Sequence, residues 1–362
     1  MARLGDWLVT LQRWAFGLCA LLLVLAALYV SLGRELVPWV ADYRAALEEH
    51  ARQALGLPLR IGNLEGRWER FSPLIYAHDV EIGEGDERVR LERILVVPDI
   101  WGSLLERQPR LASLTLQGLS LTLHQDGDGA WRLEGIPKLG QGDWPLDPNR
   151  ALAQLGRIAR LSLLDSRLSI ELPDTEPFSL TGINLSLQSG SRQRLDGRFS
   201  LPDGQPLAFS LRTRLDGEDW RRSAVELYAS LPQSDWAAWL PAGLTRDWHL
   251  RELRAGGELW LRLERARLQH GVLRLHAPRI AGAYAGRPEV ALADLSLTAY
   301  IDEGRDGLRA LVDSLAVSLG ETRWGEVRLS LREQRDAESG SRWRLSADRL
   351  HLTPLLPVVR AL

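Results

Sequence analysis

Few residues in this sequence have the types and spacing that metal binding or catalysis requires. The closest two histidines, His270 and His276, stand six positions apart in a segment with strand-like alternation, and the His-Glu-x-x-His pattern of zinc enzymes is absent. The run Asp126-Gly127-Asp128-Gly129 begins like a calcium loop but lacks the distal glutamate, so we interpret it as a hairpin turn. The sequence therefore predicts no metal site.

Motifs for nucleotide binding and nucleophilic catalysis are equally weak. The glycine pairs within residues 83–85 and 282–286 lack the flanking strand and helix of a phosphate-binding loop and indicate turns. No Gly-x-Ser-x-Gly elbow occurs, and no paired carboxylates favour an anchored cell-wall hydrolase. Cys19, the only cysteine, lies in an N-terminal apolar run, so the remainder can form neither a disulfide nor a thiolate metal site. We predict a non-enzymatic protein without a cofactor.

The composition of the chain argues against a nucleic-acid partner. The formal net charge is −2, and the basic residues are almost all arginine. No basic stripe accompanies the 14 tryptophans, which argues against a stacking surface for nucleic acid. We expect the tryptophans at strand ends and interfaces.

The first 35 residues predict a membrane anchor. Residues 15–32 form an uncharged run rich in Leu, Ala and Val, which as a helix would rise about 27 Å, close to the ~30 Å hydrocarbon core of a bilayer. Trp14 on one side and Tyr29 on the other suit the two interfaces. A cleaved signal peptide is the alternative, but its apolar region is normally only about 7–15 residues long, and residues 29–32 make a poor cleavage site. We favour the uncleaved anchor.

Charge on either side of this run indicates its orientation. Arg3 and Arg13 precede it, whereas Arg34 and Arg44 follow it among acidic residues that carry little weight. The small positive-inside bias favours a cytoplasmic N-terminus and an exported remainder.

Residues 36–56 predict a short amphipathic helix. Apolar residues recur at helical spacing from Leu36 to Leu55, Pro38 fits the first turn, and Gly56 ends the pattern. Such a helix would lie at the membrane surface or plug one end of the structure that follows, and the sequence favours neither role.

Residues 57–362 alternate leucine with polar residues in short runs. Strand side chains point to opposite faces with period two, so each run has one apolar and one polar face. Turn residues separate the runs, as at Asp203-Gly204 and Asp306-Gly307, and such short connections predict an antiparallel meander. The alternation changes phase around residues 117–118 and 165–166, where we expect a turn or a bulge.

Little helix is available to cover the apolar face. Candidate helices at residues 100–106, 148–158 and 234–240 could cover only a small part of it. A β-sandwich would fold the sheet on itself, but roughly 20 short strands exceed what a usual sandwich needs. Stacked at ~4.8 Å, they would make a trough on the order of 100 Å long. We predict a mainly β fold in which a long twisted antiparallel sheet curls into an open hydrophobic groove.

The candidate lining residues of this groove are apolar members of the clearest alternating runs, with the inward set inferred from polarity. They are Leu119, Leu121, Leu123, Leu168, Ile170, Leu207, Phe209, Leu211, Leu259, Leu261, Leu263, Leu273 and Leu275.

Two stretches resemble the AsmA-like proteins. Residues 59–68 (Leu-Arg-Ile-Gly-Asn-Leu-Glu-Gly-Arg-Trp), continuing to Asp79-Val80, are similar to the opening strands of that family. Residues 99–105 (Asp-Ile-Trp-Gly-Ser-Leu-Leu), followed by the alternating run 111–123, are more specific and resemble its YhdP branch. Elsewhere the similarity extends over the chain as general strand pattern only.

The resemblance implies a single-pass inner-membrane protein of Gram-negative bacteria whose periplasmic β-groove moves phospholipids toward the outer membrane. It implies phospholipids and the inner membrane as partners, with other envelope proteins at the groove ends, and no catalytic residues. Members of this branch are several times longer, so it also implies that residues 57–362 are the truncated N-terminal portion of the groove. The alternative is a non-catalytic envelope assembly or scaffold protein with a closed β-sandwich.

Overall fold

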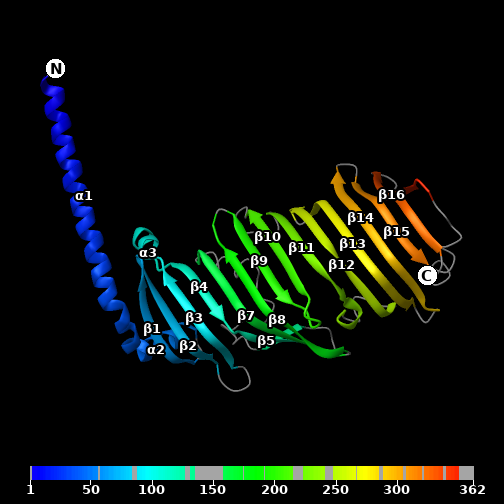
Figure 1. Cartoon of the computed structure of the whole chain (residues 1–362), viewed down its shortest axis with the longest axis horizontal. Coiled ribbons are helices and arrows are strands. Elements are labelled where there is room, and N and C mark those ends of the chain that lie inside the picture. Colours follow the sequence, from blue (N-terminus) through cyan, green and yellow to red (C-terminus); the bar gives the residue numbers. More distant parts are fainter. Residues whose placement is uncertain are drawn as a thin grey trace.

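The computed structural model describes residues 2–55, 58–83, 88–126, 131–134, 158–173, 175–190, 192–214, 223–240, 248–265, 267–284, 288–304, 307–319, 322–336 and 340–349. A long helix, α1 (Ala2–Leu36), stands beside one end of a single extended sheet (Figure 1). The 3-10 helix η1 (Val37–Tyr43) and α2 (Arg44–Leu55) join α1 to the first strand. Two further short helices are α3 (Ile100–Glu106) and the 3-10 helix η4 (Trp236–Ala238).

The strands account for most of the described chain. They are β1 (Leu59–Glu69), β2 (Ser72–Ile82), β3 (Val89–Pro98), β4 (Leu111–Gln117), β5 (Ser120–Gln125), β6 (Trp131–Glu134), β7 (Arg160–Leu172), β8 (Thr175–Gln188), β9 (Gln193–Ser200), β10 (Pro206–Arg214), β11 (Ala224–Asp235), β12 (Trp248–Glu264), β13 (Arg267–Tyr284), β14 (Val290–Gly304), β15 (Gly307–Leu319), β16 (Thr322–Asp336) and β17 (Gly340–Ala347).

All seventeen strands belong to one open sheet. Each strand pairs antiparallel with the next from β1 to β4 and again from β7 to β17. β5 continues the line of β4, and β6 pairs with β5, so that fifteen strands (seventeen less these two) lie abreast. At ~4.8 Å per strand the sheet spans about 65–70 Å.

The expectation of a purely antiparallel meander is wrong at one place. β4 and β5 both pair in parallel with β7. Residues 135–159 separate β6 from β7, and a connection of that length can return the chain in the parallel sense, whereas a hairpin turn cannot. The strands are also fewer and longer than expected, up to 18 residues in β13. A mainly β chain with an N-terminal apolar helix, an open sheet and few helices is otherwise confirmed.

The predicted short helices have mixed outcomes. The helix over residues 100–106 is confirmed as α3. In place of the helix expected over 234–240, β11 runs to Asp235, whose carboxylate then caps the single turn η4 by accepting from the Ala237 N–H. Of residues 148–158 only Ile158 is described, and it forms a β-bridge with Leu111.

The two phase changes in the sequence belong to a set of left-handed residues in β2, the β4–β5 junction, β7 and β8. Asp79, Gly118, Asp165 and Gly182 have φ of 50°, 72°, 47° and 55° in β2, the β4–β5 junction, β7 and β8. The Gly118 N–H donates to the Leu164 carbonyl at 3.0 Å, which places the irregularities of β4–β5 and β7 side by side. Each adds one residue to the alternation, so apolar side chains return to the same face beyond it.

The segment after α1 closes the β1 end of the sheet. A Cβ on Gly66 would lie 1.9 Å from the Val37 carbonyl oxygen, so η1 rests directly on β1. The Glu48 carboxylate accepts from the Ile61 N–H at 2.8 Å, and Arg44 donates to the Gly62 carbonyl at 3.0 Å. Of the two roles left open for residues 36–56, these contacts favour the plug.

Candidate functional site

One face of the sheet carries two unbroken rows of apolar residues, each made of cross-strand partners from β1 to β17. The first apolar row is Gly66, Ile75, Val96, Leu114, Leu161, Leu187, Leu195, Leu211, Leu227, Leu261, Gly271, Ile301, Ala310, Leu331 and Leu345. The second apolar row is Leu64, Ala77, Ile94, Leu116, Leu163, Leu185, Gly197, Phe209, Ala229, Leu259, Leu273, Ala299, Val312, Leu329 and Ala347. Directly paired residues share a face, so this apolar face is continuous.

The opposite face is mainly charged or polar, although in β11–β15 the partners Tyr228, Trp260, Val272, Tyr300 and Leu311 lie on it too. One row of cross-strand partners on it consists of Arg212, Glu226, Arg262, His270, Asp302, Arg309, Arg332 and Arg344. His270 belongs to this row and lies 2.5 Å from the Asp302 carboxylate, while His276 pairs across strands with Ser296. From β10 to β17 the sheet therefore has one apolar face and one largely polar face.

All thirteen predicted lining residues share the apolar face. Leu211 and Leu261 belong to the first apolar row, and Phe209, Leu259 and Leu273 to the second. The other members of these strands follow at two-residue steps, namely Leu207, Leu263 and Leu275. Beyond the left-handed residues, cross-strand pairs join Leu121 to Leu168 and Leu123 to Ile170, while Leu119 packs on the buried cluster of β1–β3.

Sequence reasoning missed the members of the rows in β1–β4, β7–β9, β11 and β14–β17. Most of them, such as Leu187 and Leu331, alternate with polar residues as regularly as the residues that were chosen. The glycines Gly66, Gly197 and Gly271 have no apolar signal, and only the strand register places them in the rows.

No second layer covers most of the apolar face in the described structure. Each of the thirteen predicted residues is half-buried rather than buried. The main buried cluster, which includes Leu64, Val80 and Leu91, lies on β1–β3 under η1 and α2. A closed sandwich would bury such leucines along its length, so that alternative does not describe this sheet.

Polar interactions that shift titration lie away from the apolar face. In α2 the Gln53 amide donates to Glu49, and this bond, with Arg52 beside it, lowers the pKa of Glu49. At the β17 end the Arg328 N–H donates to the Asp348 carboxylate at 2.9 Å and lowers its pKa. These contacts support a helix turn and the β16–β17 edge, and they build no catalytic arrangement.

Tryptophans occupy two kinds of position. Trp68, Trp101 and Trp236 lie at a strand end or in short helices, as expected. Trp260 does not: it lies inside β12 on the polar face, with its ring 5.2 Å from the Tyr228 ring and the Arg274 guanidinium 5.3 Å from its centroid.

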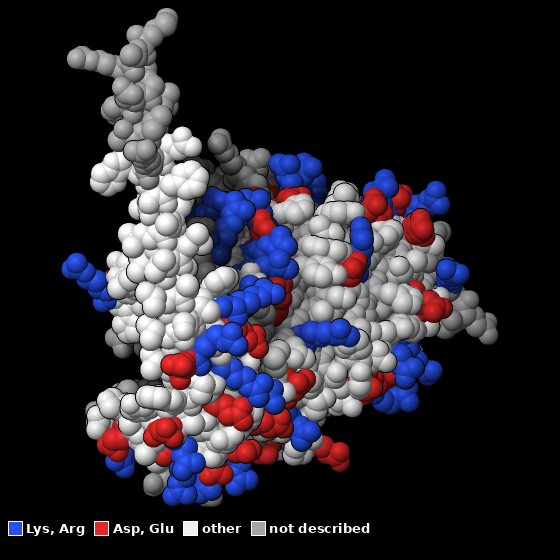
Figure 2. All heavy atoms as spheres, turned by 60° about the vertical axis from the view of Figure 1, so that its left-hand side comes forward, with Lys and Arg blue, Asp and Glu red and all other residues white. Residues whose placement is uncertain are grey.

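One helical segment in the described part of the chain, Trp14–His50, is long and apolar enough to cross a membrane, and the protein buries none of its apolar window. Figure 2 shows α1 as a surface almost free of charge, whereas charged side chains of both signs lie over the neighbouring elements. Length and composition therefore fit a single-pass anchor.

Comparison with known proteins identifies a relative and a family. The intermembrane phospholipid transporter YhdP of Escherichia coli (strain K12) is 22% identical over 339 residues, which cover 92% of this chain and 26% of that relative. The chain thus spans about a quarter of the relative's length. No solved structure matches the chain. A family model described as YhdP protein matches residues 1–362, and the chain therefore belongs to the YhdP family.

Proposed function

We propose that this chain is a bridge-like lipid-transfer segment that carries phospholipid acyl chains along the two apolar rows between the inner and outer membranes. The observation that carries the proposal is the continuity of both rows through fifteen strands, combined with their half-buried leucines. The phospholipid transporter among its relatives supports the choice of ligand.

The apolar face offers acyl chains many equivalent positions. Each methylene taken from water onto it contributes about 0.8 kcal/mol. Adjacent strands repeat at ~4.8 Å, and each step exchanges one set of apolar neighbours for another. A chain can therefore slide without leaving a tight site, while its headgroup stays in water at the open rim.

The segment formed by η1 and α2, which we call the cap, covers β1 and determines where this path begins. η1 lies on Gly66, and the cluster beneath α2 and η1 is already filled by protein side chains. Acyl chains would therefore occupy the face from β4 onward and reach it from the side. In this proposal the N-terminus is cytoplasmic, the sheet is periplasmic, and other envelope proteins meet its ends.

Photocrosslinking with adjacent residues tests the proposal. Leu261 and Arg262 are neighbours in β12 on opposite faces. A photoreactive residue at position 261, in the protein in its native membrane, is expected to capture phospholipid, whereas one at 262 is not. Equal lipid capture at both positions would refute the proposal, and protein capture alone at 261 would favour a role in binding envelope proteins.

A further inference from the structure

Four large apolar side chains stand exposed on the rim of the sheet beside α1. Phe71, Trp101, Leu104 and Leu105 expose 67%, 62%, 68% and 82% of their surfaces. Phe71 lies in the β1–β2 turn, and the other three lie in α3, which connects β3 to β4. None belongs to either apolar row, so the proposed transport path does not account for them.

Contacts with α1 fix the height of this cluster. The Tyr29 hydroxyl donates to the Phe71 carbonyl at 3.0 Å, and the Tyr29 ring lies 5.2 Å from the Trp68 ring and 5.9 Å from the Trp101 ring. Tyr29 precedes Leu32, the last residue of the uncharged run, by three residues. At 1.5 Å per residue, Tyr29 therefore lies about 4.5 Å inside the end of that run, and the Trp101 ring packs beside it.

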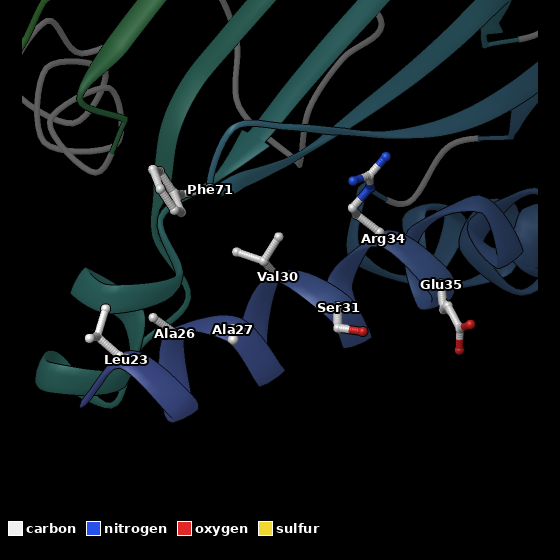
Figure 3. Close-up of a pocket in the computed structure, with 8 residues that line it drawn as sticks. All are labelled: Leu23, Ala26, Ala27, Val30, Ser31, Arg34, Glu35 and Phe71. Carbon is white, nitrogen blue, oxygen red and sulfur yellow. The ribbon is translucent and has the colours of Figure 1, made fainter. Parts of the chain in front are cut away.

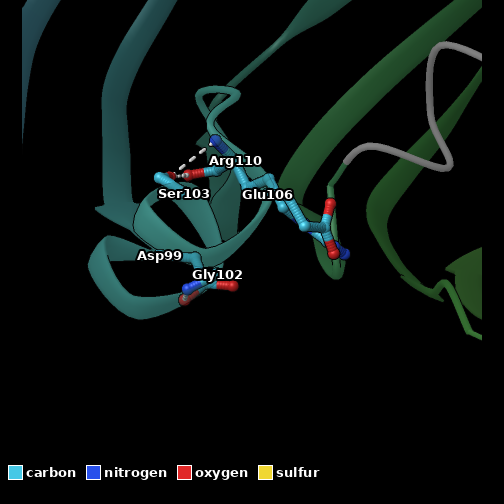
Figure 4. Close-up of polar contacts among 5 residues, drawn as sticks. All are labelled: Asp99, Gly102, Ser103, Glu106 and Arg110. Atoms are coloured by element: carbon cyan, nitrogen blue, oxygen red, sulfur yellow. Dashed lines mark hydrogen bonds and ion pairs between the residues drawn. The ribbon is translucent and has the colours of Figure 1, made fainter.

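Hydrogen bonds hold α3 in a defined position (Figure 4). The Asp99 carboxylate accepts from the Gly102 N–H at 2.8 Å, and the Ser103 hydroxyl accepts from the Arg110 N–H at 2.9 Å. Glu106 and Arg110 form an ion pair. These polar contacts satisfy the short helix from the protein side. Its exposed surface consists of Trp101, Leu104 and Leu105, together with Glu106, which is paired with Arg110.

A cleft of about 670 Å³ separates α1 from the β1–β2 turn (Figure 3). Its walls include Leu23, Ala26 and Val30 of α1 and Phe71 of the turn, and its other end is lined by Ser31, Arg34 and Glu35. Apolar walls followed by charged and polar side chains match the order of acyl chain and headgroup in a phospholipid leaflet.

We propose that Phe71, Trp101, Leu104 and Leu105 form a membrane foot that inserts into the leaflet on the sheet's side of the bilayer crossed by α1. The occupant of this surface is lipid, because its contacts with Tyr29 carry it to the depth of the membrane span. A tryptophan beside two leucines is the composition of an interfacial anchor. The inference requires that α1 spans the membrane and is independent of transport along the sheet.

The membrane foot also determines how close the first uncovered strand lies to the membrane. α3 ends where β4 begins, and β4 is the first strand beyond the buried cluster. Insertion of the foot therefore brings the rim at β4 to the acyl layer, where lipids could enter the path; this consequence rests on the proposed function.

Depth-dependent fluorescence quenching tests the foot. In a Cys19→Ala background, Leu105→Cys carries an environment-sensitive dye, and the chain is reconstituted in vesicles of phosphatidylethanolamine and phosphatidylglycerol. Nitroxide lipids report depth, with the spin label placed either at the headgroup or near the acyl end. Asp203→Cys, in the β9–β10 turn, is the matched aqueous control, and the native Cys19 within the span is the membrane control.

We expect the label at position 105 to shift its emission to shorter wavelength and to lose most of its intensity to the headgroup-proximal nitroxide. The label at 203 should instead be quenched by iodide in water. If 105 behaves like 203 while Cys19 is quenched by lipid, the foot is wrong. If Cys19 also escapes lipid quenching, the span on which the foot depends is wrong and the proposal falls with it. Neither result bears on lipid crosslinking at Leu261.

Discussion

A single carboxylate on the second apolar row should obstruct lipid movement, whereas the same charge one residue away should not. Leu163 lies in β7 between Leu116 and Leu185 on the apolar face. Ser162, its neighbour, lies between Thr115 and Ser186 on the polar face. Leu163→Asp and Ser162→Asp therefore add the same charge to the same strand on opposite faces.

The size of the effect follows from the strand spacing. An acyl chain that crosses one strand covers ~4.8 Å, or about four methylenes, and each loses about 0.8 kcal/mol if it must stay in water to avoid the carboxylate. The barrier rises by about 3 kcal/mol, which corresponds to a roughly hundredfold slower passage at 1.36 kcal/mol per factor of ten. Ser162→Asp should leave the rate within about twofold of the parent.

The assay is the rate of phospholipid movement between the two membranes in cells whose only copy carries the variant. Circular dichroism and thermal unfolding of both purified variants check that the sheet is intact, since Leu163 is half-buried and its loss costs about 1–2 kcal/mol. If Leu163→Asp folds and transports at the parent rate, acyl chains do not pass over this face and the reasoning fails.

Three further predictions concern bound lipid, the cap and α3. Mass spectrometry of the chain in mild detergent should detect phospholipid held by the apolar rows; a lipid-free spectrum would contradict an occupied face. Gly66→Val should displace η1, because its Cβ would lie 1.9 Å from the Val37 carbonyl oxygen. We expect the free energy of unfolding to fall by about 1–3 kcal/mol and the Ile61 amide to exchange faster. An unchanged melting temperature would show that η1 can shift without cost. Asp99→Ala removes the carboxylate that accepts from the Gly102 N–H, at a cost of about 1 kcal/mol, and should speed exchange in α3; Asp99→Asn, which keeps an oxygen acceptor, should restore protection.

Alternation along the chain was sufficient to predict a mainly β chain and to place the chosen apolar residues on one face, but not the number or length of the strands. Runs such as Leu259, Leu261 and Leu263 predict a shared face, because alternate side chains of a strand point the same way whatever the strand pairs with. The phase changes near Gly118 and Asp165 likewise predicted an irregularity before its form was known.

Alternation along the chain could not predict which distant residues pair or contact one another. The parallel contact of Leu114 with Leu161 depends on how residues 135–159 return the chain, and no local pattern encodes that path. The contact of Val37 with Gly66 is similar, since a glycine gives no sign that a backbone rests on it. The exposed apolar residues of α3 could be read as core until the structure placed them on the rim.

The pairing order from β7 to β17 means that the length of this sheet grows in proportion to the number of strands. Among the described residues, each of these strands pairs only with its immediate neighbours along the chain, apart from the junction with β4 and β5. Inserting or deleting one hairpin would therefore change the reach of the molecule by about 10 Å while leaving distant strands undisturbed. Evolution could therefore match the length of such a sheet to the width of a compartment one hairpin at a time.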